Sequence, residues 1–140
     1  MNRLLATVLL FAVALSATAA ETIIVSIPAN VDRPLESHYR DALAAALRAR
    51  GEAVRTEVVV RGGRADIVTP TLAIEVERAH KWHEAIGQSL HYGDVLGISP
   101  AIAIIDADTL PAEQLAVLKA LAAKYGIALI FLQKNSLKNN

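Results

Sequence analysis

The chain has 140 residues and a mass of 14.9 kDa, which is long enough for one domain and too short for two comfortable ones. Hydrophobic residues make up 54% of it, which excludes intrinsic disorder, and the lack of cysteine excludes disulfides and thiolate metal sites. Basic and acidic side chains both number 14, so a polybasic coat for nucleic acid is excluded, although a local basic patch is not.

The first 20 residues have the pattern of a secretory signal peptide. Arg3 supplies a positive charge, residues 4–15 are almost wholly apolar, and small residues follow at 16–20. Twelve helical residues rise only about 18 Å, well short of the ~30 Å hydrocarbon core, which argues against a permanent membrane span. We expect cleavage after residue 19 or 20 and export, to the periplasm if the cell is Gram-negative. The alternative is an uncleaved N-terminal anchor.

The mature chain is expected to begin with a strand and a helix. β-branched residues at 22–27 predict a short strand that ends at Pro28. Apolar residues at helical spacing over 35–47 predict a helix with Pro34 in its first turn and a stop at Gly51.

Three strands and a second helix are expected next. The strands lie at about 52–61, 64–69 and 72–78, and the helix runs from about Ala79 to Tyr92 and ends at Gly93.

The last part of the domain predicts a strand, a helix and a strand. Residues 101–105, after Pro100, form a continuous apolar run, which is typical of a strand covered on both faces. A third helix is expected to start within 108–111 and to end at Gly126, before a buried strand at 127–132. The polar residues 134–140 are expected to form a loose C-terminal tail.

This order of elements predicts the fold class. Three meandering strands followed by strand–helix–strand crossovers imply a mixed sheet with helices against it. We therefore expect a three-layer α/β structure in a single domain over residues 21–133.

Acidic residues collect on the two central strands. A two-residue turn at Pro70-Thr71 would place Asp66 directly opposite Glu75, with Glu77 on the same face as Glu75. Like charges at opposed positions are destabilising, so three carboxylates on one patch need compensation. A hard divalent cation such as Mg²⁺, Mn²⁺ or Ca²⁺ would supply it.

The same acids could instead form a solvated outer face with Arg64 and Arg78 as partners. The register is also open, because Pro-Thr is not a favoured hairpin dipeptide. A slip of one residue would send Asp66 and Glu75 to opposite faces.

The second helix carries further candidates. Trp82, Ile86 and Leu90 form a stripe that we expect to pack against the sheet. Lys81 and Gln88 share another face, from which Lys81 could reach the acidic site or lie on the surface.

A zinc site is a rival on the same helix. His80 and His83 are spaced i, i+3, which chelates less naturally than i, i+4, with Glu84 and the more distant His91 nearby in sequence. Exposed polar histidines are the alternative.

At these residues the chain resembles the PD-(D/E)XK nuclease superfamily, whose members have the restriction-endonuclease-like fold. The resemblance spans roughly Pro34 to Ile105 and rests on the order helix, three strands, helix, strand, and on four short segments. These are GRAD at 63–66, AIEVE at 73–77, LESHYR at 35–40 and QSLHY at 88–92, and small proteins with signal peptides share the helix motifs.

The resemblance implies a metal-dependent nuclease. It makes Asp66 and Glu75 the ligands of Mg²⁺ or Mn²⁺, with Glu36 joining them, and Gln88 a residue that positions the site. The lysine of the motif is Glu77 here, so either Glu77 or Lys81 would orient or deprotonate the attacking water.

Nucleic acid is the partner implied by a nuclease. Phosphate contacts could come from five arginines that lie close together in sequence, namely Arg48, Arg50, Arg55, Arg61 and Arg64. The rival class is a non-catalytic module of the same fold that binds a protein or nucleic acid in the cell envelope, which the near-zero net charge and the missing lysine favour.

Overall fold

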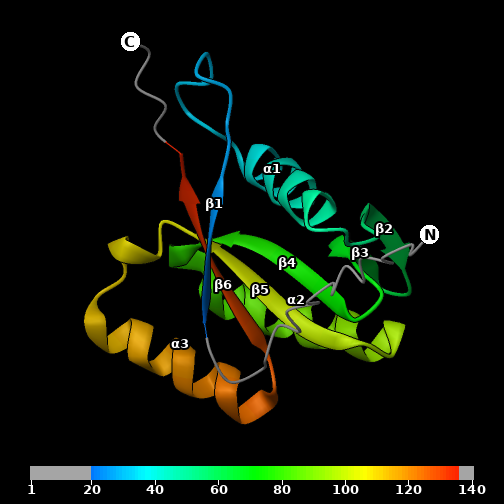
Figure 1. The fold of residues 1–140 in the computed structure, drawn as a ribbon. Coiled ribbons are helices and arrows are strands. Elements are labelled where there is room, and N and C mark those ends of the chain that lie inside the picture. Colours follow the sequence, from blue (N-terminus) through cyan, green and yellow to red (C-terminus); the bar gives the residue numbers. More distant parts are fainter. Residues whose placement is uncertain (1–19, 136–140) are drawn as a thin grey trace, which may run out of the picture.

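The computed structural model describes residues 20–135, which form a six-stranded sheet with helices packed against it (Figure 1). The α-helices are α1 (Glu36–Ala49), α2 (Trp82–Leu96) and α3 (Ala112–Tyr125), and two 3-10 turns, η1 (Ala79–Lys81) and η2 (Ala107–Thr109), precede α2 and α3. The strands are β1 (Glu21–Val25), β2 (Arg55–Val60), β3 (Gly63–Val68), β4 (Leu72–Arg78), β5 (Ser99–Ile105) and β6 (Ala128–Lys134).

The sheet is mixed, with the strand order β1-β6-β5-β4-β3-β2. The neighbouring pairs β1–β6, β6–β5 and β5–β4 are parallel, whereas β3 is antiparallel to both of its neighbours, β4 and β2. Parallel neighbours need crossover connections, and α2 and α3 provide them between β4, β5 and β6. The predicted mixed sheet of a three-layer α/β fold is confirmed.

Helix α1 covers one face of the sheet. Its buried residues Leu43 and Leu47 pack with Ile74 of β4 and with alternate residues of the other parallel strands, such as Ala103. The i, i+4 spacing of the two leucines puts both on the side of the helix that meets the sheet.

Helices α2 and α3 cover the opposite face, as Figure 1 shows. Trp82 from α2 and Leu118 from α3 pack with Ile102 and Ile104 of β5. All residues from Ala101 to Ile105 are buried, as expected for a strand covered on both sides.

Helix α2 extends beyond its predicted end at Gly93. A Cβ atom on Gly93 would lie 3.0 Å from the Ile98 carbonyl oxygen and 3.1 Å from the Pro100 nitrogen, so this glycine lets the helix pack closely. The helix ends instead at Gly97, whose φ of 66° is the left-handed conformation common after helices.

The two chain ends bear on other predictions. The expected signal peptide lies outside the described residues except for Ala20, as do residues 136–140 of the expected tail. The tail begins later than predicted, because β6 continues through Lys134, which pairs with Val25 of β1. Among the described residues, no helix has the length and apolar character needed to span a bilayer.

Candidate functional site

The β3–β4 hairpin has the predicted register. Ile67 pairs with Ile74 and Val68 with Ala73, so the turn is centred on Pro70-Thr71. The Thr69 hydroxyl oxygen accepts hydrogen bonds from the backbone N–H groups of Thr71 (3.3 Å) and Leu72 (3.0 Å). A threonine that bonds the backbone ahead of it stabilises a turn, which explains how an unfavoured central dipeptide holds this register.

The ladder between β3 and β4 stops at Asp66. At this point the Val76 N–H donates to Asp66 Oδ2 (2.9 Å), a side-chain oxygen. The carboxylate of Asp66 therefore lies where the two strands separate, next to the strand that carries Glu75 and Glu77.

Glu75 is a buried carboxyl group beside Asp66. It is 5% exposed, and its Oε1 has no hydrogen-bond partner among the described residues. Burial, and then the negative charge of Asp66 with a side-chain hydrogen bond to it, raise the pKa of Glu75 to about 9. The two carboxyl groups approach each other, so the one-residue slip that would separate them does not occur.

Glu77 makes a second carboxyl pair, with Glu36 from α1. It is 7% exposed, and the Arg78 N–H donates to its Oε1 (2.9 Å). Burial raises the pKa of Glu77 to about 7; the Arg78 N–H and the charge of Lys81 oppose the rise, and the charge of Glu36 with a hydrogen bond to it adds to the rise. Glu77 therefore titrates near neutral pH, and the positive charge of Lys81 acts to lower its pKa.

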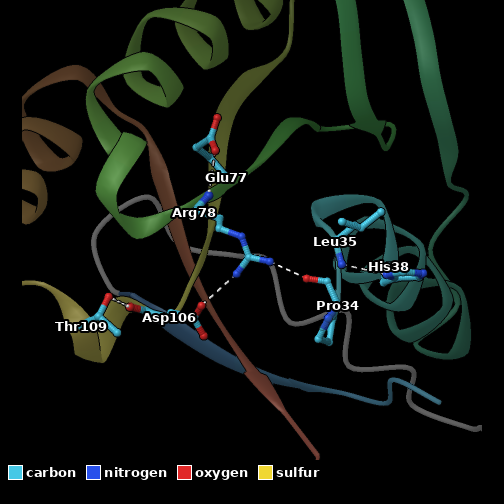
Figure 2. A network of polar contacts seen from close by, with 7 residues as sticks. All are labelled: Pro34, Leu35, His38, Glu77, Arg78, Asp106 and Thr109. Atoms are coloured by element: carbon cyan, nitrogen blue, oxygen red, sulfur yellow. Dashed lines mark hydrogen bonds and ion pairs between the residues drawn. The ribbon is translucent and has the colours of Figure 1, made fainter. Parts of the chain in front are cut away.

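Arg78 fixes the end of β4 to the start of α1 (Figure 2). One of its guanidinium nitrogens is 3.0 Å from Asp106 Oδ2, and another donates to the Pro34 carbonyl oxygen. Pro34 lies two residues before Glu36, so this contact helps to place the first turn of α1 over the acidic strand. From the sequence, Arg78 could be identified only as a positive charge near acidic residues.

Two further hydrogen bonds in Figure 2 stabilise the segments around Pro34 and around Asp106, which Arg78 joins. The Leu35 N–H donates to His38 Nδ1 (2.8 Å) at the start of α1. Asp106 has a φ of 58°, and its carbonyl oxygen accepts from the Thr109 hydroxyl (2.6 Å).

A cavity of about 210 Å³ opens between α1 and β3. It is lined by Glu36, Ser37, Arg40, Arg64, Asp66 and Val76. Glu57 of β2 pairs with both arginines there: its Oε1 lies 3.1 Å from an Arg40 nitrogen and 3.3 Å from an Arg64 nitrogen. A larger cavity, of about 470 Å³, lies near η2 and β6 and contains none of the predicted site residues.

The structure places the predicted residues of α2 on different sides. Tyr92 is buried, and its hydroxyl oxygen accepts from the Arg64 N–H (3.3 Å). Gln88 is exposed, and its side chain hydrogen-bonds to none of the residues from 20 to 135. The packed side is set by Trp82, Ala85, Ser89 and Tyr92, with Ile86 and Leu90 partly buried beside it.

The histidines of the zinc alternative have other contacts. His83 stacks on Trp82 with ring centroids 3.6 Å apart, and His91 Nε2 lies 2.9 Å from the Arg61 carbonyl oxygen. His80 and Glu84 are exposed.

Of the five predicted phosphate-contacting arginines, only Arg64 lines the acidic cavity. Arg48 donates to the Val54 carbonyl oxygen (3.1 Å), and Arg50 pairs with Glu21 (2.6 Å). Sequence proximity therefore did not bring these arginines to one site, because they come from the C-terminal end of α1, from β2 and β3, and from the turn between these strands.

The donor set fits a hard cation that keeps part of its water shell. Within the described part of the chain, no three His, Asp or Glu side chains lie close enough to hold a metal by themselves. Asp66 and Glu75 form a pair, and Glu36 lines the same cavity as Asp66, but its charge acts mainly on Glu77. Mg²⁺ commonly takes one or two carboxylates and fills its remaining positions with water or substrate phosphate.

Comparisons with protein-family models, with curated proteins and with solved structures each found no match.

Proposed function

We propose that this protein is an exported, divalent-metal-dependent nuclease of the restriction-endonuclease-like fold, which hydrolyses phosphodiester bonds of nucleic acid. The resemblance to the PD-(D/E)XK superfamily implies a core of α1, β2, β3, β4, α2 and β5 in that order. The observed sequence of elements and the parallel pairing of β4 with β5 agree with such a core.

The observation that carries the proposal is the Glu75 carboxyl group. A buried carboxyl oxygen without a partner, close to a second carboxylate, leaves both a desolvation cost and a repulsion unrelieved. A divalent cation bound by Asp66 and Glu75 would relieve both at once. Structural reasons alone do not require such a pair, because apolar side chains of similar size are commonly neutral or stabilising in its place.

The residues of the site would have different roles in hydrolysis. Asp66 and Glu75 would hold Mg²⁺ or Mn²⁺, which when bound lowers the pKa of water and neutralises charge on the phosphate. Glu77 has a pKa of about 7, which suits a base that accepts a proton from the attacking water. As water oxygen bonds to phosphorus, the bond to the leaving sugar oxygen breaks, and that oxygen takes up a proton.

Glu77 occupies the position where the superfamily motif has lysine. Lys81 lies close enough for its charge to oppose the raised pKa of Glu77, so a cation is still present at this side of the site. Lys81 would then orient the attacking water or the phosphate, and the charge of Glu36 would help to keep the pKa of Glu77 raised.

Nicking of supercoiled plasmid in Mg²⁺ or Mn²⁺ tests this function. We expect Asp66→Asn and Glu75→Gln to lower the rate by at least about 10–100-fold, the loss seen even for residues that only support metal ligands. Glu113→Gln makes the same charge change on an exposed residue of α3 and should leave the rate unchanged. Equal nicking by wild type and Asp66→Asn would mean that this site does not cut.

A non-catalytic module of the same fold is the second candidate. The absence of a ready-made three-residue metal site among residues 20–135 and the glutamate at position 77 favour it. Titration calorimetry with Mn²⁺ separates the candidates. If neither the wild type nor Asp66→Asn gives a heat of binding, the result supports the binding module. Heat that Asp66→Asn removes would support the metal site.

A further inference from the structure

Glu57 has a backbone conformation that is unusual inside a strand. Its φ is 52°, in the left-handed region, although it lies in the middle of β2. The pairing of β2 with β3 is interrupted at this residue, between the pairs Thr56–Ile67 and Val58–Ala65. A non-glycine residue in this region costs on the order of 1 kcal/mol, and such strain is often found at functional sites.

The unusual backbone places the Glu57 carboxylate between two arginines. A single oxygen, Oε1, lies 3.1 Å from Arg40 of α1 and 3.3 Å from Arg64 of β3. Arg40 is also fixed from its other side, because Asp41 Oδ1 lies 2.8 Å and 2.9 Å from two further guanidinium nitrogens. One guanidinium nitrogen of Arg40 is therefore held toward the position that Glu57 Oε1 now occupies.

These arginines line the same cavity as Asp66, together with Ser37. The side chain of Arg40 is only 15% exposed, so its charge is fixed at the cavity, whereas Arg64 reaches in from a more exposed position. Two guanidinium groups that converge on one oxygen match the bonding of a phosphate oxygen.

We propose that Arg40 and Arg64 form a phosphate-binding subsite, and that Glu57 is an internal anion that occupies it until a phosphate displaces the Glu57 carboxylate. This inference rests on the proposed function, which brings a phosphodiester to Asp66. In the free protein, Glu57 offsets one of the two positive charges and occupies the place of the phosphate oxygen, which keeps nucleic acid affinity low. When a phosphate binds, the Glu57 side chain moves out and the constraint on its backbone is released.

Replacing Glu57 tests the subsite directly. Glu57→Gln removes the charge and should raise affinity for nucleic acid by about three- to tenfold, the range set by two partly exposed ion pairs. Glu57→Gly removes the whole competing side chain and should also raise affinity, by the same gain less whatever the release of backbone strain contributes to binding in wild type. The salt dependence of binding should become steeper in both variants, because two arginines become available to phosphates.

The measurement is fluorescence anisotropy of a short labelled single strand with EDTA present, so that no cleavage occurs. Glu113→Gln is the matched control, since it makes the same charge change on α3 and should leave the affinity nearly unchanged. Arg40→Met should weaken binding more in the Glu57→Gln background than in wild type, because only there is Arg40 free to bind phosphate. Inorganic phosphate should compete better against the labelled strand in Glu57→Gln than in wild type.

Several outcomes would decide the matter. Equal affinity of wild type and Glu57→Gln for both the labelled strand and inorganic phosphate, or an equal gain in Glu113→Gln, would overturn the subsite, even if Asp66-dependent nicking is found. A gain in Glu57→Gln that Arg40→Met abolishes would support the subsite, even if no metal-dependent nicking is found and the nuclease proposal fails. A gain for inorganic phosphate alone would keep the subsite and reject nucleic acid as its source of phosphate.

Discussion

Replacing Glu75 with glutamine should make the metal-free protein more stable near pH 7.5 and remove the part of its pH dependence that Glu75 causes, leaving the part that Glu77 causes. The pKa of Glu75 is about 9 in the folded protein and about 4.5 when the side chain is freely solvated. Between these values the folded chain keeps a proton that the unfolded chain releases. The free energy of unfolding of the wild type therefore falls as pH rises through this window.

The size of the effect follows from the width of the window. Each pH unit is about 1.4 kcal/mol, so the two and a half units between about pH 5 and about pH 7.5 give a ceiling of about 3.5 kcal/mol. Glu75 is almost fully buried, so solvent screening reduces this little, but it shares its proton with Asp66, and we expect about 2–3 kcal/mol. Glutamine keeps the shape of the side chain, its amide can donate to Asp66, and it carries no proton to lose.

Urea unfolding in EDTA at about pH 5 and about pH 7.5 measures the difference. Wild type and Glu113→Gln should lose the same amount of stability between the two pH values, and Glu75→Gln should lose much less. The reasoning would be refuted if the wild type were equally stable at both pH values, or if Glu75→Gln kept the dependence of the wild type.

Three further predictions concern other parts of the structure. A Cβ atom on Gly63 would lie 2.9 Å from Cε1 of the Tyr92 ring, so Gly63→Ala should lower the unfolding free energy by about 1–3 kcal/mol. The control Gly87→Ala lies on an open helical surface and should raise the unfolding free energy by about 0.5–1 kcal/mol. Equal effects of the two variants in urea unfolding would contradict the packing argument. Arg78→Met should lower the unfolding free energy by about 1–3 kcal/mol, because it leaves Asp106 and the Pro34 carbonyl without their partner, whereas Arg61→Met on the surface should change it by less than about 0.5 kcal/mol. Nicking activity should rise with pH as Glu77 loses its proton, with a midpoint below the metal-free pKa of about 7 because a cation held by Asp66 and Glu75 favours the carboxylate; a pH profile in which Glu77→Gln kept this step would remove Glu77 as the base.

Local sequence patterns were enough to predict the framework of the site. The alternation around Ile67 and Ile74 predicts both strands, and a two-residue turn at Pro70-Thr71 gives the register that the structure has, although the dipeptide left a slip of one residue open. The unbroken apolar run at 101–105 predicts a central strand, and the structure buries all of it. These predictions succeed because the period of side chains along a strand is itself local.

Features that depend on contacts between distant segments were not predictable in the same way. Nothing near Glu57 in sequence indicates a left-handed residue, because the interruption of pairing involves β3 and two arginines from other elements. Gly93 looked like a helix end, and only its close approach to Pro100 shows why the helix continues past it. The burial of Tyr92 was not predictable either, because the position of its ring is set by its fit against Gly63 of β3.

The candidate site lies between these two cases. The convergence of Asp66 and Glu75 follows from the hairpin register alone, whereas the pairing of Glu77 with Glu36 needs the position of α1 over the sheet. That position depends on Arg78, whose bonds to Asp106 and Pro34 join residues far apart in the chain.

Titration calorimetry with Mn²⁺ near pH 7, in two buffers that differ in ionisation enthalpy, tests most directly whether Asp66 and Glu75 share one cation. A metal ion that replaces the proton of Glu75 releases that proton to the buffer. The heats of binding in the two buffers should therefore differ by the difference in their ionisation enthalpies, multiplied by about one proton per ion bound. Glu75→Gln should bind more weakly and lose this proton release. Binding of Mn²⁺ that released no proton, or that was the same in wild type and Glu75→Gln, would contradict the account.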